Sequence, residues 1–410
     1  MTLSAGTTIQ DATLSLYHLL DPEVVANPYP LYHRLQTEDP VHWDPFLHCW
    51  VVTRYSDVLS ILHRFSADCA PKPEVVAAAA MSEVSPIAKI LMNQFLFMDP
   101  PRHTQLRGLV AHTFSPHRVE NLRSHIRDIV DNLLDAVESR GRMEVMANLA
   151  NPLPTILSAE FLGLPISDHD QLKAWSTDVA EILGNFQHNA DHVSRMLRSL
   201  GEMESYIRAA IREQQRQDSD GLVNVLATAE VEGVRLTTEE VIANSILLMV
   251  GAQETTPNLI GCGMLSLLRN PDQLERLRSD FSLISPAVEE LLRYESPSQH
   301  TSRLATEDTE LGGKEIRKRQ AMIVVMGAAN RDPERFPEPD RLDITRDNNK
   351  HLAFGAANHY CFGAPLARIE GQIAIEAILR RFPNLALEPE PIAWRYNAGL
   401  RGLEALPVRF

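Results

Sequence analysis

Cys361 stands where a sulfur atom could serve as a metal ligand, in a glycine-flanked loop that runs directly into a predicted helix. Pro365 suits the first turn of that helix. Apolar side chains then recur at helical spacing, at Leu366, Ile369 and Ile373. Because a helix N-terminus presents unpaired N–H groups and partial positive charge, we expect the pKa of Cys361 to be lowered and its thiolate to be favoured.

Two glycines, Gly355 and Gly363, bracket this cysteine. Without a Cβ atom, the backbone at these positions can approach a flat ligand closely or adopt positive φ. Backbone donors along such a loop could hydrogen-bond the sulfur and tune a bound iron. The alternative interpretation is that Cys361 is a small buried hydrophobic residue, as lone cysteines usually are.

A long helix is predicted to start after Thr237, whose spacing to Glu240 is that of a capping box, and to continue to Asn270. At 1.5 Å per residue it would span roughly 50 Å, a length that only a central element needs. Pro257 lies inside it and has no N–H group, so the carbonyl of Gln253 loses its intrahelical partner. We therefore expect a bulge or kink at this point.

Just before this proline, a carboxylate and an alcohol are neighbours, Glu254 and Thr255. The Thr255 hydroxyl can reach back to the carbonyl of Gly251, and the small side chain of Ala252 leaves space over a ligand. Such a polar notch could hold dioxygen and relay protons to it. A proline-kinked core helix without chemistry is the alternative interpretation.

Glu290 and Arg293 are three residues apart on one predicted helical face and can form an ion pair. On the surface such a pair would contribute little to stability.

A possible set of cations for a bound carboxylate is spread along the chain. His103 and Arg107, at positions i and i+4, share a helical face, and Arg303 and His359 could join them. Buried carboxylates need cationic or hydrogen-bonding partners. Taken singly, each of the four is more often a surface charge.

The composition favours one large helix-rich domain built around a cofactor. The chain has 410 residues, a hydrophobic fraction of 44% and no glycine- or serine-rich linker. Its formal charge of −15 opposes nucleic acid binding. It has neither a signal peptide nor an apolar run of about 18 residues, so we expect a cytoplasmic protein that does not enter a membrane. The four cysteines form no CxxC pair, and reduced thiols are expected.

Strand-like segments are short. They cover Trp50 to Thr53 near the start and Ala321 to Met326, which follows a turn signal at Gly312 and Gly313. The middle of the chain has the pattern of successive amphipathic helices. We therefore expect a mainly α fold with a small β portion.

The cysteine segment resembles the heme-binding loop of the cytochrome P450 superfamily. The matching positions are Phe354, Gly355, His359, Cys361 and Gly363. The Glu254–Thr255 pair resembles the oxygen-activation motif of that superfamily, and Glu290 with Arg293 resembles its ExxR signature. The order and spacing of the three motifs also agree, and the resemblance extends over essentially the whole chain.

Three positions depart from the superfamily pattern. Ala357 and Arg319 stand where glycines are usual, and the usual Ala–Gly order is transposed to Gly251 and Ala252. Ala357 tolerates positive φ less well than glycine, at a cost of about 1 kcal/mol.

The resemblance implies a single cytochrome P450-type domain over residues 1–410, with heme b between the long central helix and the helix that follows the cysteine. Cys361 would be the axial iron ligand, and Glu254 with Thr255 would deliver protons to bound O2. The other residues implied at the heme are His103, Arg107, Ala252, Arg303, Phe354, Gly355, His359 and Gly363.

A third basic residue would join the structural pair of Glu290 and Arg293. Arg346 is favoured for this position, and Arg335 and Arg341 remain open.

The implied activity is a monooxygenase that inserts one oxygen atom from O2 into a lipophilic small molecule, by hydroxylation or epoxidation, in secondary metabolism. The resemblance places substrate contacts near Leu247 and Val250, around Gln299 to Thr301, near Tyr396 and Asn397, and in the apolar stretch from Val75 to Phe97. It also implies a monomer that takes electrons from a separate ferredoxin. A basic face for that donor is predicted at Arg118, Arg123, Arg127 and Lys350.

Other functions remain open at this point. A heme-thiolate sensor or binding protein would need the Cys361 loop but gives no reason for the acid and alcohol pair. A peroxide-driven hydroxylase of fatty acids, or a non-redox heme isomerase, would also use the loop.

Overall fold

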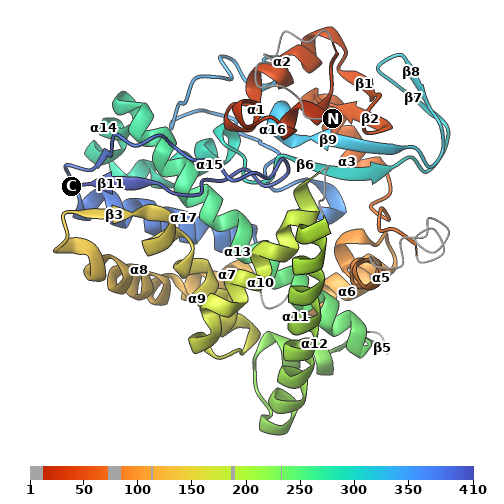
Figure 1. Cartoon of the computed structure of the whole chain (residues 1–410), viewed down its shortest axis with the longest axis horizontal. Coiled ribbons are helices and arrows are strands. Elements are labelled where there is room, and N and C mark those ends of the chain that lie inside the picture. The colour runs from red at the N-terminus through yellow and green to blue at the C-terminus, as the bar shows by residue number, and fades with distance from the viewer. Residues whose placement is uncertain (1–12, 73–84, 112–113, 186–189, 232) are drawn as a thin grey trace.

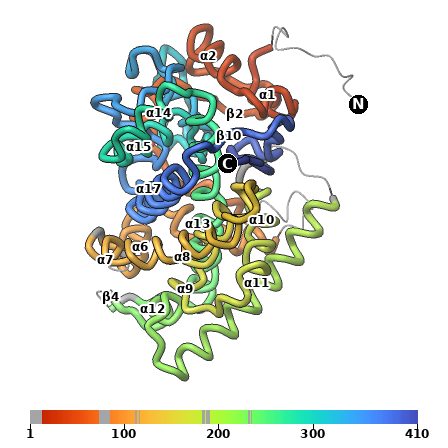
Figure 2. Tube along the Cα trace, turned by 90° about the vertical axis from the view of Figure 1, so that its left-hand side faces the viewer, coloured from red at the N-terminus to blue at the C-terminus, as the bar shows by residue number. Residues whose placement is uncertain are grey.

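Helices form most of the molecule, and a small sheet covers one corner of it (Figures 1 and 2). The computed structural model describes residues 13–72, 85–111, 114–185, 190–231 and 233–410. The prediction of a mainly α fold with a small β portion is confirmed. The helices are α1 (Pro22–Ala26), α2 (Tyr29–Glu38), α3 (Tyr55–Arg64), α5 (Ser85–Met92), α6 (Arg102–Ala111), α7 (Pro116–Asn121), α8 (Arg123–Glu138), α9 (Pro152–Leu162), α10 (His169–Gly184), α11 (Ala190–Gln217), α12 (Leu222–Thr228), α13 (Thr238–Arg269), α14 (Pro271–Ser279), α15 (Ile284–Tyr294), α16 (Met326–Ala329) and α17 (Ala364–Arg381).

The largest sheet joins segments that are far apart in the sequence. Its strand order is β1 (Val41–Asp44), β2 (Cys49–Val52), β9 (Ala321–Val325) and β6 (His300–Leu304), with β2 and β9 parallel and the other pairs antiparallel. Both predicted strands are therefore present, each shifted or shortened by one residue.

The smaller sheets are β3 (Arg142–Glu144) with β10 (Ala386–Leu387) and β11 (Pro407–Arg409), β4 (Glu230–Val231) with β5 (Val234–Arg235), and β7 (Thr309–Leu311) with β8 (Lys314–Ile316). The predicted turn between β7 and β8 is confirmed, since both of its glycines have positive φ, 57° at Gly312 and 75° at Gly313.

The central helix α13 runs through the middle of the molecule (Figures 1 and 2). Its N-terminus has the predicted capping box: the Thr237 side chain accepts from the backbone N–H of Glu240, and the Glu240 carboxylate accepts from the backbone N–H of Thr237. Its 32 residues correspond to roughly 48 Å. The helix ends at Arg269, one residue before the predicted end.

Pro257 frees one carbonyl within α13, and a neighbouring helix supplies the missing donor. The Nζ of Lys173, on α10, lies 2.7 Å from the carbonyl oxygen of Gln253. The Thr255 hydroxyl donates to the carbonyl of Gly251 at 2.6 Å, as the sequence predicted. The carbonyl freed by the proline and the neighbouring Thr255 hydroxyl therefore both have hydrogen-bond partners.

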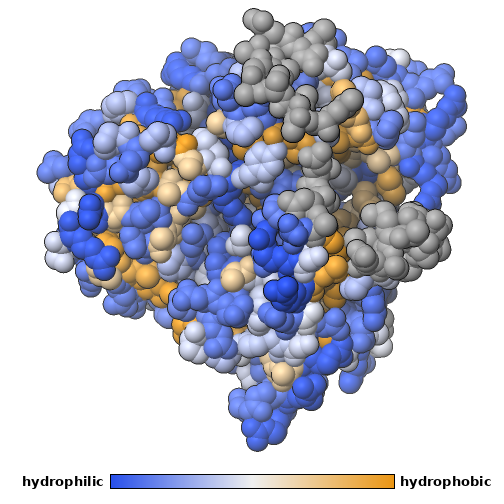
Figure 3. Space-filling model, viewed as in Figure 1, coloured by the Kyte–Doolittle hydropathy of each residue, from blue (hydrophilic) through white to orange (hydrophobic). Residues whose placement is uncertain are grey.

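The core lies mainly between α13, α17, α8, α9 and α15, whose buried apolar residues form one cluster. Helices α13 and α17 approach closely at Gly371, where a Cβ atom would lie 2.9 Å from Leu259. Polar side chains cover most of the face in Figure 3, with apolar residues in smaller patches. Across the described ranges, no helix is both long enough and apolar enough to cross a membrane.

Glu290 and Arg293 form an ion pair inside the core rather than on the surface. Both side chains are fully buried, and two arginine nitrogens each lie 2.8 Å from a carboxylate oxygen. Of the three arginines left open by the sequence, Arg346 is the one that contacts this carboxylate, at 3.2 Å. The side chains of Arg335 and Arg341 bond other groups. The buried acid therefore has two cationic partners.

Glu370, on α17, is a buried acid without such partners. Its side chain is only 2% exposed, and its Oε2 has no hydrogen-bond partner among the described residues. Burial raises the pKa of Glu370 to about 8. The folded protein therefore keeps this proton up to about pH 8, whereas the unfolded chain loses it near the ordinary value for glutamate.

Replacing Arg293 by methionine should leave Glu290 charged and buried without its closest partner. We expect the free energy of unfolding to fall by about 3–5 kcal/mol, measured by urea denaturation. The control is Glu376→Gln, which breaks the exposed i,i+4 pair with Arg380 and should cost no more than about 0.5 kcal/mol. Equal small losses in the two variants would contradict the assignment of a buried, mutually dependent pair.

The variant Glu370→Gln should gain stability over the wild type as the pH rises. Ionisation favours the unfolded chain between the unfolded and folded pKa values, so the stabilising contribution of the neutral acid is lost as the pH rises from about 4.5 to 8. We expect a difference near zero at pH 5 and of roughly 2–4 kcal/mol above pH 8, measured by denaturant or thermal unfolding. Glu376→Gln, a change at a partly exposed position on the same helix, should show no such trend.

Candidate functional site

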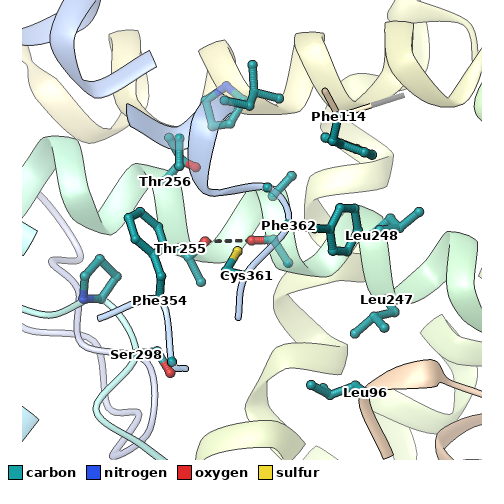
Figure 4. Close-up of a pocket in the computed structure, with 18 of the residues that line it drawn as sticks. Leu96, Phe114, Leu247, Leu248, Thr255, Thr256, Ser298, Phe354, Cys361 and Phe362 are labelled. Atoms are coloured by element: carbon teal, nitrogen blue, oxygen red, sulfur yellow. Dashed lines mark hydrogen bonds between the residues drawn. The ribbon is translucent and has the colours of Figure 1, made fainter. Parts of the chain in front are cut away.

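A cavity of about 340 Å³ lies between α13 and α17, and the Cys361 sulfur faces it (Figure 4). Its walls are mostly apolar. They come from α9, α13 and α17, from the 3-10 segment η3 (Phe95–Phe97), from residues around β6 and from the cysteine loop. A mostly apolar cavity of this size with few polar groups is typical of a site for a cofactor and a lipophilic ligand.

The loop that carries Cys361 has the geometry that the sequence predicted. The backbone N–H of Cys361 donates to the carbonyl of Phe354 at 2.9 Å. Helix α17 begins three residues after Cys361, with Gly363 as its N-cap. Gly355 has a φ of 67°. Ala357 also adopts a positive φ, 57°, so its methyl group is accommodated at a cost of about 1 kcal/mol.

The predicted lowering of the Cys361 pKa is wrong for the protein alone. The Cys361 side chain is exposed to the cavity, but desolvation by the surrounding protein raises the pKa of this thiol, and the backbone N–H groups of Gly363 and Ala364, together with Arg107, offset only part of that rise. A coordinating metal cation deprotonates a thiol outright, so the raised value does not oppose metal binding.

A group of basic side chains collects at one edge of the cavity. Arg107, Arg303 and His359 line it, and the ring of His103 packs at a tilt of 38° against that of His359, with centroids 4.1 Å apart. Burial lowers the pKa of His359 to about 3, with a further contribution from His103. Burial and then Arg107 lower the pKa of His103.

Several nitrogens of this basic group have no hydrogen-bond partner within the described ranges. They are both ring nitrogens of His103, Nε of Arg303 and Nε2 of His359, and all are buried. Buried donors are normally paired, so this edge of the cavity requires an acceptor from a ligand. The two propionates of a heme supply such acceptors, and Cys361 supplies the metal ligand. These residues therefore fit a heme.

One face of α13 forms the opposite wall of the cavity. Gly251, Ala252, Thr255 and Thr256 line it. The hydrogen bond from the Thr255 hydroxyl to the Gly251 carbonyl is the dashed line in Figure 4. An alcohol therefore lies across the cavity from the sulfur of Cys361.

Glu254 does not share this notch, which corrects the expectation of an acid and an alcohol side by side. Its carboxylate is buried outside the cavity lining, 2.5 Å from Nζ of Lys173 and 2.7 Å from Nη1 of Arg395, and it accepts from the Thr177 hydroxyl at 3.0 Å. Burial alone would raise the pKa of Glu254, but Lys173 and Arg395 outweigh it and hold the pKa below its usual value. Successive helical residues point about 100° apart, so neighbours in sequence need not share a face.

Of the predicted substrate contacts, Leu247 and Thr301 line the cavity, whereas Val250, Gln299, Tyr396 and Asn397 do not. Val250 is buried in the core on another face of α13. Gln299 bonds the Tyr32 hydroxyl at 3.0 Å and the Ser296 carbonyl at 2.7 Å. The Tyr396 hydroxyl donates to the carbonyl of Leu20. The side chains of Gln299 and Tyr396 are therefore engaged in hydrogen bonds within the protein.

Other cavity residues were missed or only partly anticipated. Phe95 and Leu96, from the predicted apolar stretch, do line the cavity, whereas residues 75–84 of that stretch lie outside the described ranges. Leu157 and Phe161 line it from α9. Their i,i+4 spacing was visible in the sequence, but the same spacing is typical of ordinary core packing. Thr301, which the sequence predicted, provides a hydroxyl from β6, and Ser298, which it did not, provides one just before that strand.

Comparison with known proteins agrees with this site. The family model described as Cytochrome P450 matches residues 42–392. Cytochrome P450 monooxygenase PikC of Streptomyces venezuelae is 40% identical, over 99% of this chain and 96% of that protein. The 6-deoxyerythronolide B hydroxylase of Saccharopolyspora erythraea is 33% identical, over 98% of this chain and 99% of that protein.

Solved structures give the same result. P450BioI, in complex with an acyl carrier protein bearing hexadec-9Z-enoic acid, has a TM-score of 0.89 and 35% identity, over 95% of this chain and 100% of that chain. The cytochrome P450 PksS of Bacillus subtilis has a TM-score of 0.85 and 34% identity, over 96% of this chain and 99% of that chain. With the cysteine loop, the unpartnered basic edge and the cavity already described, these matches show that the chain belongs to the cytochrome P450 family of heme-thiolate monooxygenases.

Proposed function

We propose that this enzyme inserts one oxygen atom from O2 into a bulky lipophilic molecule of secondary metabolism, by hydroxylation or epoxidation. The observation that carries the proposal is the position of the Cys361 sulfur, which faces an apolar cavity with Thr255 on the opposite wall. When bound, the heme supplies the iron chemistry that activates O2 and transfers oxygen. The chain itself binds the heme, orients the substrate, excludes water and moves protons.

Thr255 is the residue to which we assign proton transfer in the cavity. Its hydroxyl donates to the Gly251 carbonyl and keeps lone pairs for an acceptor role, so it can pass a proton at Oγ1. The earlier assignment of Glu254 to the same step loses support, because that carboxylate would first have to leave both Lys173 and Arg395. We assign Glu254 a structural role in fixing α13 against α10 and the loop of Arg395.

The substrate class follows from the lining and from the relatives. Leu96, Leu247 and Leu248 offer apolar contacts, and Ser298 and Thr301 are the polar groups that could bind a hydroxyl or carbonyl. Among the relatives, PksS is named for polyketide biosynthesis, and another is named as a 6-deoxyerythronolide B hydroxylase. A polyketide or macrolide fits both observations.

Electrons would come from a separate ferredoxin with its reductase, and the enzyme would act as a monomer. Of the proposed docking residues, Arg118, Arg127 and Lys350 are exposed. Arg123 is already paired with Glu120 at 2.7 Å, so it is less available to an acidic partner. A sensor without turnover would not need an alcohol on the wall opposite the sulfur, and we therefore favour the enzyme.

The reduced, CO-bound protein should show the red-shifted Soret band of a thiolate-ligated heme, measured by absorption spectroscopy. Cys361→Ser should abolish that band because it removes the thiolate. The control is Cys262→Ser, a buried cysteine on α13 outside the cavity lining, which should keep the band. A thiolate spectrum that survives in Cys361→Ser would contradict the assignment of the ligand.

Thr255→Ala should divert electrons from product to hydrogen peroxide. With a surrogate ferredoxin system and a substrate found by spectral screening, we expect product per electron to fall at least about tenfold, because proton delivery in the cavity is lost. Thr256→Ala removes the next hydroxyl of the same wall and should keep most of the coupling. Unchanged coupling in Thr255→Ala, or full activity with peroxide alone, would count against O2 activation through this residue.

A further inference from the structure

We propose that Asn244 is a positioning residue that sets the shape of the substrate cavity by holding residues 93–97 against α13. The inference rests on the proposed function, because it concerns ligands bound on the same side of the heme as the substrate. Asn244 does not line the cavity; it would act through the segment that does.

The Asn244 side chain joins α13 to this segment with both atoms of its amide. Its Oδ1 accepts from the backbone N–H of Phe95 at 2.9 Å. Its Nδ2 donates to the carbonyl of Asn93 at 2.9 Å and to the carbonyl of Glu240, within α13, at 2.8 Å. The side chain is fully buried, so these bonds are shielded from competing water.

Two neighbouring contacts strengthen the same connection. The Gln94 side chain, which is also buried, donates from Nε2 to the carbonyl of Ala243 at 3.2 Å. One turn earlier, the Glu240 carboxylate pairs with Arg102 at 2.5 Å, at the start of α6. The first turns of α13 therefore hold the chain on both sides of η3. Asn244 both accepts from the segment and donates to it.

The held segment and α13 each carry part of the cavity wall. Leu96 enters it from η3, and Leu247 enters it from α13, one turn after Asn244 (Figure 4). Phe95 also lines the cavity, and its ring packs edge-on against that of Phe362, the neighbour of Cys361, with centroids 5.6 Å apart. A shift of the Phe95 backbone would therefore move both the substrate wall and a side chain beside the iron ligand.

Loss of the Asn244 amide would leave the N–H of Phe95 and the carbonyl of Asn93 without their partners. Buried groups in that state carry a free-energy penalty, which the segment can relieve by moving toward water. A purely structural asparagine would lower stability without changing which ligands bind. A positioning residue would change the selectivity for ligands that reach Leu96.

The test compares two probes that share one iron-binding group, imidazole and 1-dodecylimidazole, by spectral titration of the heme-loaded protein. Both probes bind the iron through the same group, so this contribution cancels in the ratio of their dissociation constants. The ratio therefore measures how strongly the dodecyl chain binds to the apolar wall. In Asn244→Ala we expect 1-dodecylimidazole to bind roughly tenfold more weakly and imidazole to bind within about twofold of the wild type.

Asn258→Ala is the matched control. Asn258 is also a fully buried asparagine of α13, but neither atom of its amide has a hydrogen-bond partner in the part of the chain that the structure describes. It should leave the ratio unchanged. Hydrogen exchange adds a second readout: the Phe95 amide should lose protection in Asn244→Ala and keep it in Asn258→Ala.

An unchanged ratio in a heme-loaded Asn244→Ala protein would overturn the proposal, as would an equal change in Asn258→Ala. If Asn244→Ala yields no heme-loaded protein, Gln94→Ala takes its place. It removes the bond to Ala243 and should shift the ratio at least about twofold in the same direction; no shift would overturn the proposal. Failure of the proposed function is recognised separately, because the wild-type CO adduct would then lack the thiolate band.

Discussion

The spacing between α13 and α17 is the constraint on which the site depends. The two helices are drawn together where side chains are small: a Cβ atom at Gly371 would lie 2.9 Å from Leu259, and one at Gly263 would lie 3.5 Å from Ile375. Toward the start of α17 the helices enclose the cavity, with Cys361 on one wall and Thr255 on the other. The same close packing that builds the core thus defines the slot for a flat cofactor.

Charges inside the molecule divide according to whether the chain itself neutralises them. Glu290 and Glu254 are both fully buried, and each has two cationic partners on the chain. At the cavity edge the situation is reversed, since His103 and Arg303 have buried nitrogens without acceptors among the described residues. Paired charges fix elements of the fold, whereas unpaired ones mark the place where a ligand completes the structure.

Sequence patterns predicted the features that depend on local geometry. The capping box at Thr237, the positive φ at Gly355 and the strands around Trp50 and Ile323 follow from short-range chemistry. The predictions that failed depend on which way a side chain points in the folded structure. Glu254 follows Gln253 on a face of α13 that is turned toward α10. Its carboxylate is held there by the cations of Lys173 and of Arg395, which lies in a distant loop. No spacing rule in the sequence distinguishes that face from the face that lines the cavity.

The Cys361 pKa and the Tyr396 contact failed for related reasons. A helix N-terminus does favour a thiolate, but the apolar surroundings created by distant residues outweigh that local effect. The hydroxyl of Tyr396 bonds the carbonyl of Leu20, a residue that only the folded chain brings near it. Burial and long-range partners are properties of the tertiary structure, and a single sequence does not contain them in readable form.

The parallel pairing of β2 with β9 imposes an order on folding during synthesis. Val52 lies opposite Val324 in the register, so the strands made first must wait for a segment that leaves the ribosome much later. A two-stranded hairpin is marginal alone, and its open edge can pair with other chains in the meantime. The sheet can therefore be completed only after β9 has been made, and until then the open edge of its N-terminal hairpin is available for premature association.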